Sequence, residues 1–76
     1  MEIIWTVEYS LDITDGELKD MIEVANDYLR KGHEREEAIQ ETVNDYLAGQ
    51  DDCIYYSITE EASQQIEDML NKLLTE

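Results

Sequence analysis

Hydrophobic and polar residues alternate at the start of the chain. In residues 2–11, EIIWTVEYSL, every odd position carries an apolar or aromatic side chain, and every even position except Ile4 is polar. Alternation with period two, in a segment rich in β-branched and aromatic residues, is typical of a strand with one buried face. Residues 53–58, CIYYSI, alternate in the same way, with Ile54, Tyr56 and Ile58 on one side. They predict a second strand.

Three other segments repeat their hydrophobic residues at helical spacing. The first helix spans about residues 15–31, and its apolar arc consists of Leu18, Met21, Ile22, Ala25, Tyr28 and Leu29. The second spans about 33–48, and its apolar side consists of Ile39, Val43, Tyr46 and Leu47. The third follows Thr59, and its buried stripe is predicted to be Ala62, Ile66, Met69, Leu70 and Leu73.

The ends of these helices carry recognisable signals. Thr14 and Glu17 have the spacing of a capping box, in which each side chain bonds the other residue's backbone N–H. Gly32 is suited to a left-handed stop after the first helix, and Gly49 ends the second. Thr59 is placed to cap the third helix.

The predicted order is therefore β-α-α-β-α in a single domain, residues 1–76. The path of the chain makes the two strands antiparallel, so we expect an α+β fold in which a two-stranded antiparallel sheet packs with three helices. A lone two-stranded sheet is weak in water. Either the helices brace the sheet, or its edge pairs with a second copy in a homodimer.

The tetrapeptide NDYL occurs twice, at residues 26–29 and 44–47. Each copy falls near the C-terminal end of a predicted helix, with Gly32 between them as a break. Periodicity alone produces such a pair when Tyr and Leu face the core and Asn and Asp face water. We interpret the repeat as two similar helix ends in a hairpin; a duplicated binding box is the alternative.

Charge changes the picture more than any motif. The chain carries 20 acidic residues against 5 Lys and Arg, for a formal net charge of −15. Such a charge repels nucleic acid and anionic membranes and attracts basic surfaces. The single cysteine, Cys53, excludes an intrachain disulfide and fits a reducing cytosol. The first residues do not resemble a signal peptide and no apolar run is long enough to span a membrane, so a cytoplasmic protein is predicted.

Catalytic and metal-binding patterns are not found. Residues 12–23 have the length of a calcium loop, but Gly16 stands at position 5 rather than 6 and a strand precedes it. His33 has no second histidine and Cys53 has no paired base. We therefore predict no enzyme activity, no cofactor and no metal. The basic residues Arg30, Lys31, His33 and Arg35 are expected to complement helix ends and to pair locally with Glu34 and Glu36.

Two rows of carboxylates form the clearest functional pattern. The row on the second helix consists of Glu34, Glu37, Glu41 and Asp45. The row on the outer side of the first helix consists of Glu17, Asp20, Glu23 and Asp27. Like charges at this spacing destabilise a helix slightly, and in a helical hairpin the rows could run side by side. They are either an ordinary solvated surface or a coarse copy of the phosphate rows of DNA.

In its size, charge and acid rows, the chain resembles the small acidic inhibitors of phages and mobile elements, which include DNA-mimic and anti-CRISPR proteins. The resemblance implies a basic nucleic-acid-binding partner, such as a CRISPR effector, restriction enzyme or repair enzyme, contacted through the eight acids. Aromatic residues that could anchor the contact are Trp5, Tyr9, Tyr55 and Tyr56. The alternative is a non-catalytic interaction module or homodimer whose charge serves solubility only.

Overall fold

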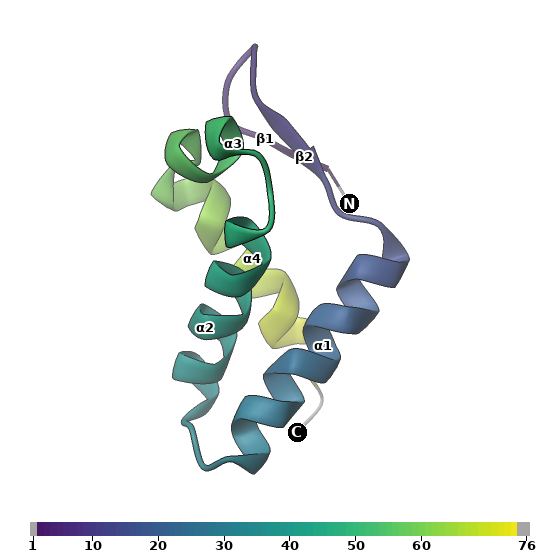
Figure 1. The fold of residues 1–76 in the computed structure, drawn as a ribbon. Coiled ribbons are helices and arrows are strands. Elements are labelled where there is room, and N and C mark those ends of the chain that lie inside the picture. Colours follow the sequence, from purple (N-terminus) through teal and green to yellow (C-terminus); the bar gives the residue numbers. More distant parts are fainter. Residues whose placement is uncertain (1, 75–76) are drawn as a thin grey trace.

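The computed structural model describes residues 2–74, which form two strands and four helices (Figure 1). The elements are β1 (Glu2–Ile4), β2 (Ser10–Asp12), α1 (Asp15–Arg30), α2 (Arg35–Ala48), α3 (Asp52–Ser57) and α4 (Glu60–Leu73). The predicted α+β class is confirmed, and the sheet has two antiparallel strands as expected, but both strands come from residues 2–12 and not one each from 2–11 and 53–58. The two ends of the predicted domain, Met1 and residues 75–76, lie outside the described residues.

The N-terminal alternation belongs to a β-hairpin and not to one continuous strand. Ile3 pairs with Leu11, and the flanking pairs place the centre of the hairpin at Val7. Because the turn is centred on a residue, the paired odd positions 3 and 11 fall on the same face of the hairpin, and both Ile3 and Leu11 are buried. Val7, at the tip of the turn, is fully exposed. The Thr6 hydroxyl accepts a hydrogen bond from the Tyr9 N–H at 2.9 Å and helps to close the turn.

The predicted strand at 53–58 is wrong, because this segment forms the short helix α3. The helical conformation pairs backbone groups within the segment: the Tyr55 N–H donates to the Asp51 carbonyl at 3.0 Å and the Ile58 N–H donates to the Ile54 carbonyl at 3.1 Å. Ile54, Tyr55 and Ile58, at helical spacing, pack against the core. The order is therefore β-β-α-α-α-α, with four helices instead of three.

The signals at the helix ends are confirmed. Thr14 and Glu17 form both bonds of the capping box, and Thr59 accepts from the Ala62 N–H. Gly32 has a φ of +100°, the left-handed conformation that favours glycine. α2 begins at Arg35 instead of His33, with Glu34 as its N-cap.

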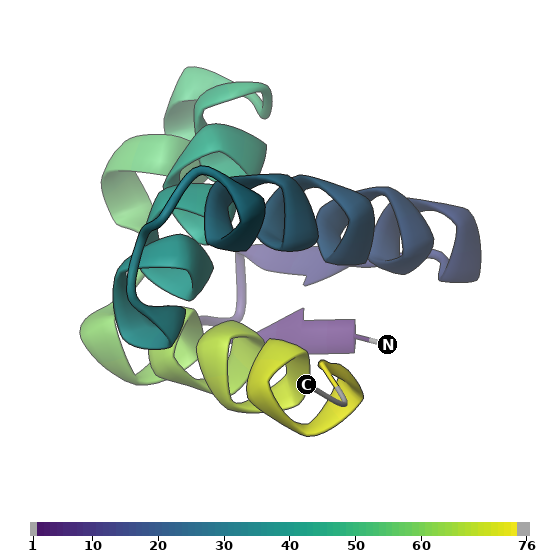
Figure 2. The ribbon, with the colours of Figure 1, turned by 90° about the horizontal axis from the view of Figure 1, so that it is seen from below.

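Helix α4 completes the core by packing against α1, α2 and β1 (Figures 1 and 2). The buried hydrophobic residues include Ile3, Ile13, Met21, Ala25, Ile39, Val43, Ile66 and Leu70. Because α2 packs against both α1 and α4, its buried face is wider than predicted and includes Ala38 and Thr42. Leu73, the last residue of α4, is exposed, and the C-cap residue Leu74 is buried in its place, which corrects the predicted stripe.

Candidate protein-binding surface on helices α1 and α2

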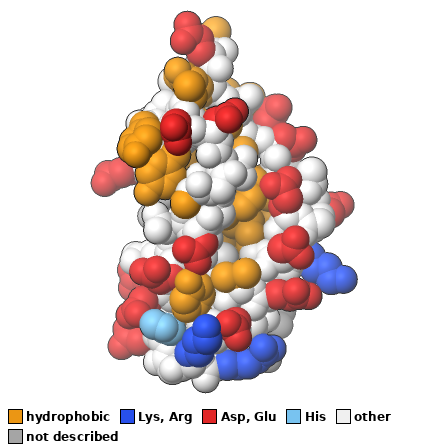
Figure 3. All heavy atoms as spheres, viewed as in Figure 1, with side chains coloured by type: hydrophobic (Ala, Val, Ile, Leu, Met, Phe, Trp, Pro, Cys, Tyr) orange, Lys and Arg blue, Asp and Glu red, His pale blue; other side chains and the backbone are white. Residues whose placement is uncertain are grey.

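Both acid rows lie on the surface of the hairpin that α1 and α2 form. Seven of the eight side chains are exposed, and Glu17 is half-buried. The space-filling view shows acidic side chains on both sides of an apolar strip (Figure 3). The structure thus places the predicted residues on one pair of neighbouring helices, with hydrophobic surface between the two rows.

A groove of about 230 Å³ lies between the rows, toward the start of α1 and the end of α2. At these ends, which are far from the turn that joins the helices, α1 and α2 diverge (Figure 1). It is lined by Glu17, Asp20, Met21, Val24, Thr42, Asp45 and Tyr46. Glu17 and Asp20 come from one predicted row and Asp45 from the other. The rows therefore meet at this groove, near the start of α1 and the end of α2.

Two tyrosines hold carboxylates of the opposite helix in place. The Tyr28 hydroxyl of α1 donates to Asp45 Oδ2 at 2.7 Å, and the Tyr46 hydroxyl of α2 donates to Glu17 Oε2 at 2.7 Å. These are the tyrosines of the two NDYL copies, and Asp45 belongs to the second copy. The repeat thus supplies a reciprocal connection between the helices, which helical periodicity alone did not predict.

These hydrogen bonds change the ionisation of the groups involved. The Tyr46 hydroxyl, together with the Thr14 N–H and hydroxyl, lowers the pKa of Glu17 and favours its charged form. Burial raises the pKa of Tyr46, and the bond to Glu17 raises it further. The bond to Asp45 raises the pKa of Tyr28. Both tyrosines thus stay neutral donors, and Glu17 stays an anion, across the neutral pH range.

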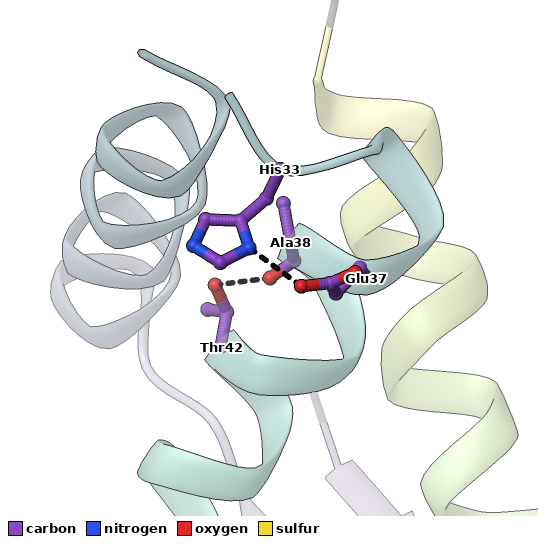
Figure 4. Close-up of polar contacts among 4 residues, drawn as sticks. All are labelled: His33, Glu37, Ala38 and Thr42. Atoms are coloured by element: carbon purple, nitrogen blue, oxygen red, sulfur yellow. Dashed lines mark hydrogen bonds and ion pairs between the residues drawn. The ribbon is translucent and has the colours of Figure 1, made fainter. Parts of the chain in front are cut away.

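Two other acids of the rows interact within their own segment. Asp27 Oδ2 lies 3.1 Å from Lys31 Nζ. Glu37 Oε1 lies 2.5 Å from His33 Nδ1 (Figure 4). Because a carboxylate only accepts, His33 Nδ1 must carry the proton in this bond. Exposed pairs of this kind contribute little to stability.

Within residues 2–74, the ion pairs of the basic residues join Lys31 to Asp27 and His33 to Glu37, rather than the expected Glu34 and Glu36. Lys31 and His33 contact the acids just described. Arg35 reaches α4 instead, where its Nε donates to Asn71 Oδ1 at 2.8 Å and its Nη2 donates to the carbonyls of Asn71, at 2.8 Å, and Leu74. Arg35 therefore satisfies carbonyls at the C-terminal end of another helix, a role that sequence spacing could not indicate because 36 residues separate it from Asn71.

A second hollow of about 420 Å³ lies between α2 and α4 and includes Arg35, Glu36, Gln40, Glu67 and Asp68 in its lining. Burial raises the pKa of the half-buried Glu67 carboxyl, and the nearby charges of Asp68 and Glu36 raise it further. Ionisation of Glu67 is therefore less favourable in the folded protein than in the unfolded chain.

Replacing Glu67 with glutamine should stabilise the protein at neutral pH. A raised folded pKa means that the contribution of Glu67 to stability is complete below its unfolded pKa and is lost as pH rises through the folded value. Glu67→Gln, which stays neutral, should add about 0.5 kcal/mol to the free energy of unfolding at pH 7. The gain should disappear below about pH 4.3, the pKa of an unperturbed glutamate. Urea unfolding at pH 7 and below about pH 4.3 measures the difference in stability between the variant and the wild-type protein. Glu8→Gln, in the exposed hairpin turn, removes one charge as a control, and an equal gain there would contradict the local explanation.

The proposed aromatic anchors are placed unequally. Trp5 and Tyr55 are half-buried and pack against the core, and Tyr9 is half-buried. Tyr56, 81% exposed, packs edge-on against the Tyr55 ring. Of the four, Tyr56 is thus the side chain most open to a partner, and it lies on α3, outside the two helices that carry the acid rows.

Within residues 2–74, no three or more His, Cys, Asp or Glu side chains are grouped so that they could hold a metal ion. None of the helices in the same range is both long and apolar enough to cross a membrane. Comparison with known proteins gives no match: no family model fits the chain, and no curated protein or solved structure is similar to it. The function must therefore be inferred from the surface itself.

Proposed function

We propose that this protein is a non-catalytic, cytoplasmic inhibitor that occupies the phosphate-binding surface of a nucleic-acid-handling protein. It would act as a DNA mimic, in the manner of anti-CRISPR or anti-restriction proteins. The observation that supports the proposal most is the hairpin of α1 and α2, which presents both acid rows on adjoining helices. Lys and Arg side chains that grip phosphates would contact these carboxylates instead.

The spacing of the charges suits such a role. Each row extends over roughly 16 Å of helix at 1.5 Å per residue. Eight carboxylates over that length give one charge per about 2 Å, compared with one per about 1.7 Å of a DNA duplex. The Tyr28 and Tyr46 hydroxyls hold one carboxylate of each row in a defined position. A surface whose charges are already positioned loses less entropy on binding than a flexible acidic tail.

A structural interaction module is the second candidate. Ile4, Val7 and Tyr56 are exposed large hydrophobic residues on β1, the hairpin tip and α3. The free edges of the two-stranded sheet could also pair with a second copy. In this case the contact would be apolar and insensitive to salt, and the charge would serve only solubility.

Competition with DNA tests the proposal. A panel of purified CRISPR effectors, restriction endonucleases and repair enzymes would be incubated with labelled duplex DNA and increasing amounts of this protein. We expect at least one member to release its DNA, with inhibition weakening steeply between low and moderate salt. No inhibition anywhere in the panel, together with a salt-insensitive dimer on a sizing column, would favour the interaction module instead.

A further inference from the structure

The groove between α1 and α2 has the size of a site for one side chain. Its volume of about 230 Å³ lies below the range of roughly 300–1,000 Å³ in which small-molecule sites usually fall. Met21, Val24 and Tyr46 give it an apolar lining. Val24 interrupts the acidic outer face of α1 at this point. A fully hydrated cation would gain nothing from such a lining, whereas a side chain with an aliphatic stem would cover it.

Two carboxylates beside this lining retain capacity to accept hydrogen bonds. Asp45 uses Oδ2 for Tyr28, which leaves Oδ1 for a partner. Asp20, on the opposite helix, makes no side-chain hydrogen bond or ion pair within residues 2–74. Glu17 has less capacity to accept further hydrogen bonds, because its Oε1 accepts from Thr14 and its Oε2 accepts from Tyr46. The groove thus combines an apolar floor with available anions on both of its walls.

We propose that this groove receives an arginine side chain of the partner protein. The aliphatic stem would cover Met21 and Val24, and the guanidinium would lie between Asp20 and Asp45. Arginine fits better than lysine because its planar fork of five donors can serve two carboxylates, and because it is more weakly hydrated and stacks on aromatic rings such as that of Tyr46. The inference rests on the proposed function and names one contact within it.

A second copy of this chain is a poorer occupant. Each copy exposes Arg30 at the end of α1, but two molecules of net charge −15 repel each other. Phosphate-binding surfaces, in contrast, carry arginines as a rule. Charge complementarity therefore favours a basic partner protein over self-association.

Titration with two peptides of equal charge, nona-arginine and nona-lysine, tests the inference by NMR at low salt. The largest shifts with nona-arginine should fall on the Met21 and Val24 methyl groups, and nona-lysine should bind more weakly. Asp20→Asn and Asp45→Asn should each weaken nona-arginine binding about fivefold. Asparagine at position 45 keeps an acceptor for Tyr28, so the fold should be retained. Glu23→Gln, which changes an exposed acid of the same α1 row outside the groove lining, should weaken binding less than the groove variants do. The matched control is Glu60→Gln, in the exposed first turn of α4 and outside both rows, which should cost less than about twofold.

The outcomes separate this inference from the proposed function. The groove proposal would be overturned, and the acid-row proposal would remain, if the NMR chemical-shift changes were spread evenly over both rows and if Asp20→Asn and Glu23→Gln weakened peptide binding equally. Shifts centred on the hollow between α2 and α4 would also overturn the groove. Absence of saturable binding by either peptide would overturn both proposals. Groove shifts that depend on protein concentration without any peptide would show that a second copy occupies it, and the inference would fail.

Discussion

Replacing Leu70 with alanine should lower the free energy of unfolding by about 3 kcal/mol, within the range found for buried leucines. The Leu70 side chain is 0% exposed and belongs to the core that joins α4 to the other elements. A domain of this length has a total stability of only about 4–11 kcal/mol. The variant should therefore unfold at much lower urea concentration, which circular dichroism would follow.

Leu73→Ala is the matched control for this prediction. Leu73 lies one turn further along the same helix and is 42% exposed, although the sequence pattern had placed it in the buried stripe. Alanine has a slightly better helix propensity than leucine, so the loss should stay below about 1 kcal/mol. Equal losses at the two positions would mean that the end of α4 packs as the periodic pattern suggested and not as the structure shows.

The helices were predictable because their signals are local. Capping residues and a 3.6-residue period act within one or two turns, and the bounds of α1 and α2 agree with the prediction to within two residues. Strand pairing is not local. A hairpin centred on Val7 keeps odd residues on one face, so the alternation of a single long strand and that of a hairpin are the same. The turn also contains no glycine, proline or asparagine to mark it.

Helix α3 was mispredicted for a related reason. Over six residues, alternation and helical spacing compete for the same side chains. Which one is realised depends on tertiary contacts, and here the helical spacing lets Ile54, Tyr55 and Ile58 pack against the core. The acids Asp51 and Asp52 before the segment were a usable signal, because they stand at the N-cap and in the first turn of α3.

For the candidate site, sequence reasoning could identify the acid rows but not their connections. Spacing at 100° per residue fixes which side chains share a helical face. It does not fix which side chain of a neighbouring helix lies opposite. The contacts of Tyr28 with Asp45 and of Tyr46 with Glu17 depend on the relative placement of α1 and α2, and so does the groove between them.

Reversing the charge of Glu37 and Glu41 should abolish most partner binding. Both side chains are exposed in the α2 row. Lysine at both positions would face the cations of the partner with like charge, which costs several kcal/mol, and would weaken binding by about a hundredfold or more. The His33–Glu37 contact is lost, but exposed pairs of this kind contribute little to stability. The fold should persist, because lysines four residues from Asp45 and three from Glu34 also replace repulsion with attraction of a few tenths of a kcal/mol. The measurement is the affinity for whichever panel member the wild-type protein inhibits.

A control variant must separate the effect of net charge on partner binding from the effect of where the charges lie. Each reversal changes the charge by two, so the Glu37→Lys, Glu41→Lys variant carries −11 instead of −15. Glu60→Lys with Glu61→Lys gives the same charge and also alters the exposed first turn of a helix, but on α4. If the rows make the contact, this control should lose only about threefold through weaker long-range attraction. An equal loss in both variants would reduce the effect to bulk charge, and undiminished binding by the α2 variant would exclude its acid row from the interface.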